Sequence, residues 1–258
     1  MTIRFAAVGL NHSHIYGHVH CLVAVGRRAF AEQKKIPRAD WEGGGGVQGM
    51  EDIAALPRIT ARLLKEGYSE ADPRKIYEDG TIQLVLTASI LDERAGVAIA
   101  AMRHGKDVMS DKPGMTSLAQ LEQIKRVQKE TGRIFSVCYS EHFQTRATVK
   151  AGELVRAGAI GEVINTVGLG PHALNNNKRP AWFFDRKRYG GILCDIGSHQ
   201  CEQFLFFANA LEAEVVSASV ANRSHTESPG LQDVGDMHLR TPSATGYIRV
   251  DWLTPDGL

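Results

Sequence analysis

The chain has 258 residues, of which 43% are hydrophobic and 23% charged, and its formal net charge is +1. This length suits two domains, and the composition is typical of a soluble globular protein. The near-neutral charge argues against the strongly basic surface of a nucleic-acid or anionic-membrane binder, and no apolar run is long enough to span a bilayer.

The start of the chain enters a strand directly, without the charged and apolar regions of a signal peptide. The cysteines are scattered and form no CxxC pair: Cys21, Cys138, Cys194 and Cys201. Free thiols are typical of proteins in a reducing compartment, so we expect a cytoplasmic location.

The first strand, residues 2–9, ends at Gly9 and is followed by an apolar helix, residues 19–25. A strand, a glycine turn and a helix open a dinucleotide-binding unit. The glycine fingerprint of that unit is altered, because Asn11 and His14 stand where its second and third glycines are expected. Asn11 tolerates left-handed backbone, but its side chain narrows the approach to a pyrophosphate.

Residues 27–35 are a candidate second strand, in which Glu32 follows Gly9 by 23 residues. An acid about 20 residues after the fingerprint binds the adenosine ribose in such domains. The alternative is a solvated charge on a short helix. Residues 36–70 contain four successive glycines, which have no preferred structure, and the rest of this stretch predicts only one helix, at 50–56 or at 59–66.

Four histidines near the N-terminus could suggest a metal site: His12, His14, His18 and His20. Neither a cysteine nor a glutamate accompanies them as a further ligand. We therefore expect no metal, and we expect these side chains at cofactor phosphates or on a helix surface.

From residue 73 helices and strands alternate. The pattern predicts helices at 73–78, 92–104 and 118–131 and strands at 82–87, 106–109 and 133–138. Asp92 and Ser117 are expected to cap the second and third of these helices, and Gly132 to close the third. Such alternation predicts an α/β domain with a Rossmann-like, doubly wound parallel sheet, assigned to residues 1–140.

The pattern then changes, and residues 141–258 predict an α+β domain. Its expected elements are helices at 145–157 and 192–208 and strands at 162–168, 215–220, 236–240 and 245–252. The short connections between the last strands favour a largely antiparallel sheet. We expect this domain to be incomplete at its C-terminal end and its exposed sheet to support a homo-oligomer, a dimer or a tetramer.

Lys112 stands between Asp111 and Pro113, just after the strand at 106–109. Pro113 disfavours helical backbone at Lys112, which places the lysine in a turn at the carboxyl end of a parallel strand. Ligands bind at that edge of an open sheet, where an ammonium can hold a substrate hydroxyl. The alternative is a surface lysine in a tight strand-to-helix turn.

Asp195 and His199 are four residues apart within a predicted helix and so share one face. A carboxylate beside an imidazole, which titrates near neutrality, forms a candidate proton-transfer pair. Gly197 between them is expected to let a ligand come close. The alternative is an ordinary surface pair.

Two motifs together resemble the Gfo/Idh/MocA family of oxidoreductases. They are Asp111-Lys112-Pro113 and the segment from Gly190-Gly191 to Asp195 and His199. The resemblance covers residues 73–257 and the first strand and turn. It implies a two-domain enzyme that uses NAD or NADP to interconvert a secondary alcohol and a ketone on a sugar, polyol or cyclitol.

The resemblance also implies site residues. Lys112 would contact the reacting hydroxyl and the nicotinamide, His199 would be the general acid/base, and Asp195 would position the substrate and His199. Further cofactor contacts would come from Gly9, Asn11, His14, Thr87 and Ser89, beside Glu32 from the spacing argument. The substrate pocket would be lined by Tyr139, Glu141, His142, His172 and Arg186. Core packing is the alternative for residues 139–142.

Two other readings stay open. The altered fingerprint and residues 36–70 also suit a ligand-binding or regulatory protein that kept the fold and lost turnover. A third possibility is an incomplete or altered version of an active parent.

Overall fold

The computed structural model describes residues 5–8 and 74–255. The chain divides into two compact units, made of residues 1–89, 96–111 and 123–136 and of residues 90–95, 112–122 and 137–258. The domain boundary expected after residue 140 stays a prediction. The expectations for Gly9, Asn11, His14, Glu32, residues 27–70, the remaining N-terminal histidines and the last three residues lie outside the described part.

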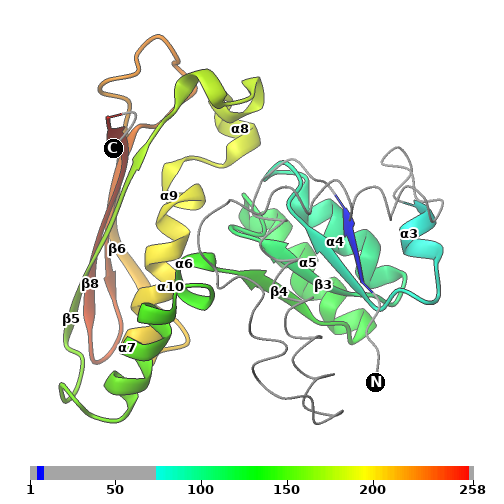
Figure 1. Ribbon diagram of the computed structural model, residues 1–258, viewed down its shortest axis with the longest axis horizontal. Coiled ribbons are helices and arrows are strands. Elements are labelled where there is room, and N and C mark those ends of the chain that lie inside the picture. Colours follow the sequence, from blue (N-terminus) through cyan, green and yellow to red (C-terminus); the bar gives the residue numbers. More distant parts are fainter. Residues whose placement is uncertain (1–4, 9–73, 256–258) are drawn as a thin grey trace, which may run out of the picture. The chain divides into compact units, whose positions relative to one another are not determined.

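A four-stranded sheet in the order β1-β2-β3-β4 confirms the expected Rossmann-like arrangement (Figure 1). Its strands are β1 Phe5–Val8, β2 Leu84–Thr87, β3 Asp107–Asp111 and β4 Phe135–Cys138. β1 pairs with β2 and β2 with β3 in parallel, so that Val8, Thr87 and Ser110 are neighbours at the carboxyl edge. Leu86, within β2, and Ala88, just after it, are fully buried.

The helices around this sheet are α3 Arg74–Glu78, α4 Arg94–Arg103 and α5 Leu118–Thr131. The caps expected for α5 are confirmed. The Oγ of Ser117 accepts a hydrogen bond from the backbone N–H of Gln120 at 3.3 Å, and Gly132 follows the helix with φ at +65°. The glycine allows this left-handed backbone at little cost.

The cap expected from Asp92 is wrong. Its carboxylate accepts a hydrogen bond from Arg188 at 3.1 Å, and α4 begins two residues later, at Arg94. A charged partner distant in sequence has replaced the local backbone amides, because a charge-assisted bond is stronger than a cap to a neutral N–H.

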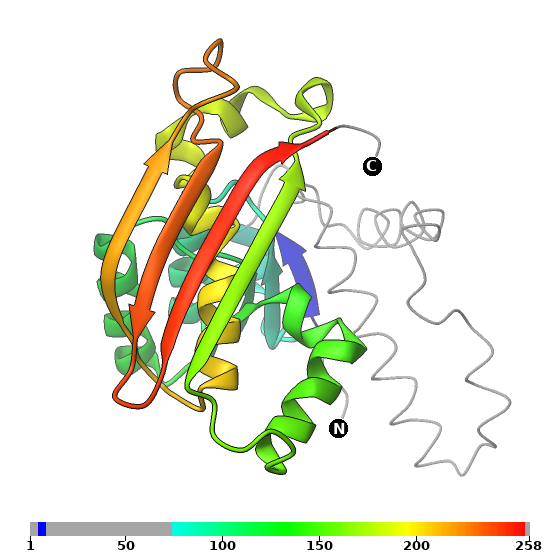
Figure 2. The same cartoon turned by 90° about the vertical axis from the view of Figure 1, so that its left-hand side faces the viewer.

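The second sheet has the order β5-β8-β7-β6 (Figure 2). Its strands are β5 Asn165–Ala173, β6 Glu214–Ala221, β7 Val234–Arg240 and β8 Thr245–Thr254. The three strands with short connections pair antiparallel, as expected, whereas β5 pairs parallel with β8. The sheet is therefore mixed, because the chain between β5 and β8 crosses over through helices, as a parallel pair requires.

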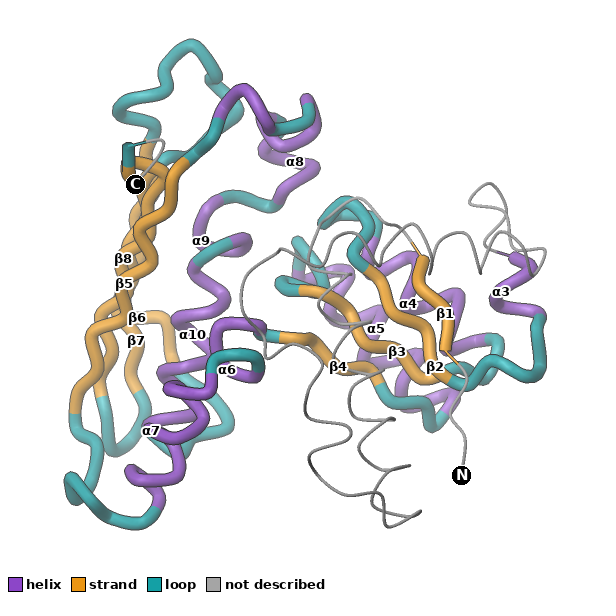
Figure 3. Tube along the Cα trace, viewed as in Figure 1, coloured by secondary structure: helices purple, strands orange, loops and turns teal. Residues whose placement is uncertain are grey.

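The helices of the second unit are α6 Ser140–Phe143, α7 Arg146–Arg156, α8 Arg186–Tyr189, α9 Ile192–Asp195 and α10 Gly197–Phe207, with 3₁₀ turns at Asn176–Lys178 and Ala181–Phe184. The single helix expected at 192–208 is thus two segments that meet at Ile196 (Figure 3). The amide of His199 bonds to the carbonyl of Ile196, three residues back, so the turn that carries His199 is tight.

Glycines on the second sheet let α10 pack closely against it. A Cβ on Gly246 would lie 2.8 Å from Phe204, and one on Gly170 would lie 3.0 Å from the side-chain amide of Gln200. Gly197 has a different role from the expected ligand approach, because a Cβ there would meet Leu193 and Met237 at 3.5 and 3.8 Å. Its bare side faces the protein core, so that interpretation is wrong.

Across the two described stretches, no helix has both the length and the hydrophobicity that crossing a bilayer requires.

Candidate functional site

Lys112 directly follows the end of β3 and lies inside the second unit. Its Nζ donates to the Oδ1 of Asp195 at 2.7 Å and to the backbone carbonyl of the same residue at 2.9 Å. The two side chains are 5% and 8% exposed. The guanidinium of the fully buried Arg94 donates a hydrogen bond to the backbone carbonyl of Lys112 and so holds the turn in place. These contacts exclude the alternative of a surface lysine.

Burying this ion pair costs desolvation free energy, which good geometry and further hydrogen bonds must offset. A buried pair is therefore weak evidence for a purely stabilising role. An ammonium carries three N–H donors, and within the described residues two of those on Lys112 are engaged by Asp195. The third can bind a ligand oxygen.

His199 lies in the first turn of α10, and its side chain is 3% exposed. Its Nε2 is 3.9 Å from the Oε1 of Glu141, and its ring meets the Tyr139 ring edge to face at 5.9 Å between centroids. Because Asp195 and His199 are both buried, the alternative of an exposed helix-surface pair is excluded.

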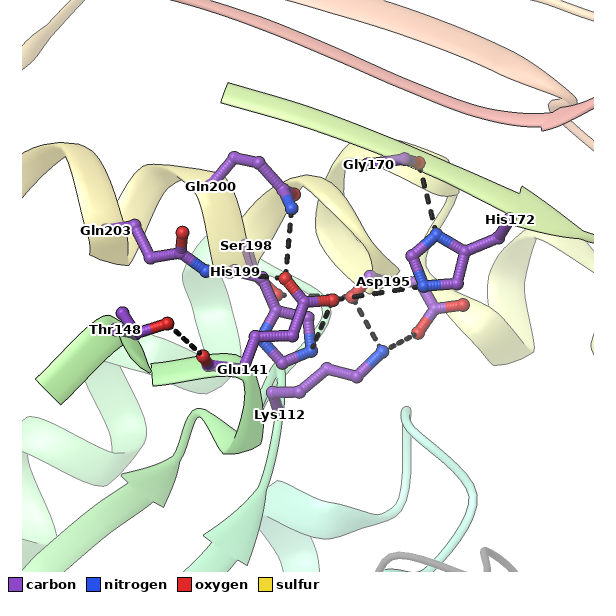
Figure 4. A network of polar contacts seen from close by, with 10 residues as sticks. All are labelled: Lys112, Glu141, Thr148, Gly170, His172, Asp195, Ser198, His199, Gln200 and Gln203. Carbon is purple, nitrogen blue, oxygen red and sulfur yellow. Dashed lines mark hydrogen bonds and ion pairs between the residues drawn. The ribbon is translucent and has the colours of Figure 1, made fainter. Parts of the chain in front are cut away.

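Glu141, in α6, joins several side chains into one network (Figure 4). Its Oε2 accepts hydrogen bonds from the amides of Gln200 and Gln203 at 3.2 and 3.3 Å. Its Oε1 lies 3.9 Å from the Nε2 of both His172 and His199. No sequence motif marks either glutamine, although Gln203 stands four residues after His199 and so shares its helix face.

Tyr139 and His142, which flank Glu141 in the sequence, lie in different environments. Tyr139 faces His199, and burial raises the pKa of its phenol to about 12, so the hydroxyl stays protonated at neutral pH. His142 instead bonds through Nδ1 to Glu202 at 2.7 Å and packs on Phe206 at 3.9 Å between ring centroids. The contacts of His142 favour packing, whereas Tyr139 and Glu141 join the network around His199.

His172, on β5, reaches the same network from the sheet. Its Nδ1 lies 3.1 Å from the carbonyl of Gly170, and its ring forms a T-shaped contact with Trp252 at 5.5 Å between centroids. Arg186 was also expected to line the pocket, and it is exposed at the start of α8. It lies against Gly191, where a Cβ would be 2.6 Å from the arginine Nε.

A further cation, Arg179, was not expected. Its guanidinium lies over the rings of Phe183 and Trp252, at 4.4 and 5.0 Å from their centroids, and its Nε donates to the carbonyl of Leu174. Burial lowers the pKa of Arg179, and the negative charge of Asp195 opposes that shift. No local sequence signal identifies such an arginine, because its aromatic partners come from separate elements.

The carboxyl edge of the parallel sheet carries the other expected cofactor contacts. Thr87 and Ser89 are buried and share a hydrogen bond of 3.0 Å. Thr87 pairs with Val8, after which the chain continues to Gly9, and with Ser110, two residues before Lys112. Small polar residues at adjacent parallel strand ends fit the ribose and phosphates of a dinucleotide. In the described part of the chain no three potential ligands gather as a metal site.

Comparisons with known proteins identify the family of the chain. Residues 47–139 match the family described as "Oxidoreductase family, NAD-binding Rossmann fold", and residues 148–258 match "GFO/IDH/MocA C-terminal domain". A solved structure of a candidate oxidoreductase from Erwinia carotovora atroseptica SCRI1043 is 38% identical, with a TM-score of 0.81, over 100% of this chain and 72% of that one.

Two curated relatives are dehydrogenases. The scyllo-inositol 2-dehydrogenase (NAD(+)) of Bacillus subtilis (strain 168) is 29% identical over 75% of this chain and 52% of its own length. The D-xylose dehydrogenase of Paenarthrobacter nicotinovorans is 25% identical over 72% of this chain and 48% of its own length. The chain thus spans about half the length of these relatives.

Proposed function

Because the chain belongs to the GFO/IDH/MocA oxidoreductase family, we propose that it is a dehydrogenase dependent on NAD or NADP. It interconverts a secondary alcohol and a ketone on a sugar, polyol or cyclitol. The observation that carries the proposal is the buried Lys112–Asp195 pair, which directly follows a parallel strand, together with the equally buried His199 four residues after Asp195. The activities named for the two curated relatives support the substrate class.

The roles of the three side chains follow from their contacts. Asp195 holds the Lys112 ammonium through two hydrogen bonds, and the remaining N–H binds the substrate oxygen and stabilises negative charge as it develops there. His199 removes the hydroxyl proton as general base. A bound nicotinamide would supply the hydride chemistry, accepting the hydride from the carbinol carbon.

Cofactor contacts are proposed for Thr87 and Ser89 at the end of β2, for Lys112, and for the N-terminal residues Gly9, Asn11, His14 and Glu32. The paired hydroxyls of Thr87 and Ser89 support this placement. Tyr139, Glu141, His172 and Arg186 are proposed to line the substrate pocket. His142 is proposed to act through packing, given its pairing with Glu202.

The test measures reduced nicotinamide formed from NAD or NADP with a panel that includes inositols, D-xylose and levoglucosan. His199→Ala and Lys112→Met should each lower kcat/KM by a factor of about 10² to 10⁴, as for loss of a general base or an oxyanion donor. His238→Ala is the matched control, because His238 is exposed on β7. Full turnover of His199→Ala would contradict the assigned role.

The altered fingerprint at Asn11 and His14 favours a second candidate, a ligand-binding or regulatory protein without turnover. Calorimetry with NAD and NADP separates the two. Micromolar binding of a cofactor together with turnover on the panel supports the enzyme. A folded protein that binds panel sugars and neither reduces nor binds a nicotinamide supports the second candidate.

We also propose a homo-oligomer in the cytoplasm. Exposed apolar side chains on β5 and β6 support a partner surface, among them Val167, Leu169 and Val215. Cys194 and Cys201 are free thiols, which suits a reducing compartment. Light scattering after size exclusion measures the oligomeric state.

A further inference from the structure

Oxidation of an alcohol produces a proton that must leave the site. One secondary alcohol and one NAD give one ketone, one reduced nicotinamide and one proton. The proposed base, His199, is only 3% exposed, so its imidazolium cannot pass the proton directly to bulk water. The side chains next to it, Glu141 and His172, are each 35% exposed.

We propose that Glu141 and His172 form a relay that carries this proton from His199 to solvent, an inference that rests on the proposed dehydrogenase function. The relay is visible in Figure 4, where the Glu141 carboxylate is joined to both imidazoles. Its Oε1 is 3.9 Å from the Nε2 of His199 and 3.9 Å from the Nε2 of His172.

The two oxygens of Glu141 have different surroundings, which suits a relay. Oε2 accepts from the amides of Gln200 and Gln203, and these donors hold the carboxylate in place without offering it a titratable proton. Oε1 faces the two histidines and is the oxygen that can take up and release a proton. At 3.9 Å, each transfer proceeds through a bridging water or a small rotation of the carboxylate.

The contact that Nδ1 of His172 makes determines which tautomer of the neutral ring is present. Nδ1 lies 3.1 Å from the carbonyl of Gly170, and since a carbonyl only accepts, Nδ1 must carry the hydrogen. In the neutral ring Nε2 then presents its lone pair toward Glu141. His172 is therefore ready to accept a proton from the glutamic acid that forms when His199 releases one.

The proton balance closes over one cycle. The substrate O–H bond breaks as His199 takes the proton, and the electron pair of the carbinol C–H bond leaves with the hydride. The proton moves from His199 to Oε1 of Glu141, then to Nε2 of His172, and from that half-exposed ring to water. All three side chains return to their starting protonation states.

The test compares the wild type with Glu141→Gln and His172→Asn in weakly buffered solution. A pH-indicator dye reports proton release while absorbance reports reduced nicotinamide. Each variant should lose at least about tenfold in kcat, and added imidazole should restore kcat in proportion to its concentration. His238→Asn is the matched control, because it changes an exposed histidine far from these contacts in the sequence.

The outcomes separate the relay from the function on which it rests. Glu141→Gln keeps a carbonyl oxygen for the two glutamine amides, so the network should stay folded, and His172→Gln provides a second substitution for the last step. Wild-type turnover with unchanged kcat in these variants would overturn the relay alone. A loss confined to KM, or one that imidazole does not restore, would overturn it too. A wild type without turnover would overturn both proposals.

Discussion

Replacing Lys112 by methionine should destabilise the second unit strongly. The substitution keeps much of the side-chain volume and removes the ammonium 2.7 Å from Asp195, both side chains being less than one tenth exposed. Breaking a buried pair by removing one partner costs about 3–5 kcal/mol, because the other charge stays buried. Asp195→Asn should cost less, about 1.5–3 kcal/mol, since Lys112 keeps the backbone carbonyl and an amide oxygen as acceptors.

The double variant Lys112→Met/Asp195→Asn measures the interaction itself. It leaves no buried charge in this pair, so its loss should be smaller than the sum of the single losses by about 2 kcal/mol. Urea unfolding can be followed by the fluorescence of Trp182 and Trp252, which pack in the core of the same unit, in a Trp41→Phe background. A loss below about 1 kcal/mol for Lys112→Met, or strict additivity, would refute the buried pair.

Three further outcomes are expected. Gly170→Ala should lower the free energy of unfolding by about 1–3 kcal/mol, because its Cβ would lie 3.0–3.1 Å from three side chains. Gly96→Ala is the control, since α4 has open space at that position and the change should be neutral or stabilising. Thermal unfolding compares the two variants, and equal melting temperatures would contradict the close approach at Gly170. Burial raises the pKa of Cys194 and Cys201 to about 11, so at pH 8 each should hold ~100-fold less thiolate than a solvent-exposed cysteine. Mass spectrometry should therefore show that both resist iodoacetamide until urea is added. Rapid labelling of the native protein would be inconsistent with this burial. Burial alone would raise the pKa of Asp233, but hydrogen bonds from three backbone amides and an imidazole outweigh it and lower the pKa. The stabilisation that Asp233→Asn removes, about 2 kcal/mol, should therefore be complete at pH 7 and shrink as pH falls below about 4; a pH-independent difference in urea midpoint would argue otherwise.

Much of the fold follows from hydrophobic periodicity and turn residues. The pattern predicted the parallel strands, α5 with its Ser117 cap, and the three antiparallel strands. It failed where a distant partner decides the local outcome. Asp92 pairs with Arg188 across 96 residues of sequence, and β5 adds to β8 in parallel, and neither contact leaves a local signal.

The sequence predicted which residues belong to the candidate site better than it predicted which side chains contact one another. Lys112, Asp195 and His199 were selected by motif spacing, and the structure brings the first two into contact across 83 residues. The directions taken by Glu141 and His142 were not predictable. A four-residue helix points one toward His199 and the other toward Glu202, and only packing against α10 decides which.

The most direct measurement of the central claim follows a labelled hydride. A polyol that the protein oxidises is prepared with deuterium on the reacting carbinol carbon, and the nicotinamide product is examined by NMR. The account predicts that the deuterium appears on the nicotinamide ring, in the wild type and, far more slowly, in His199→Ala. Reduced nicotinamide without the label, or ketone formed without nicotinamide reduction, would contradict it.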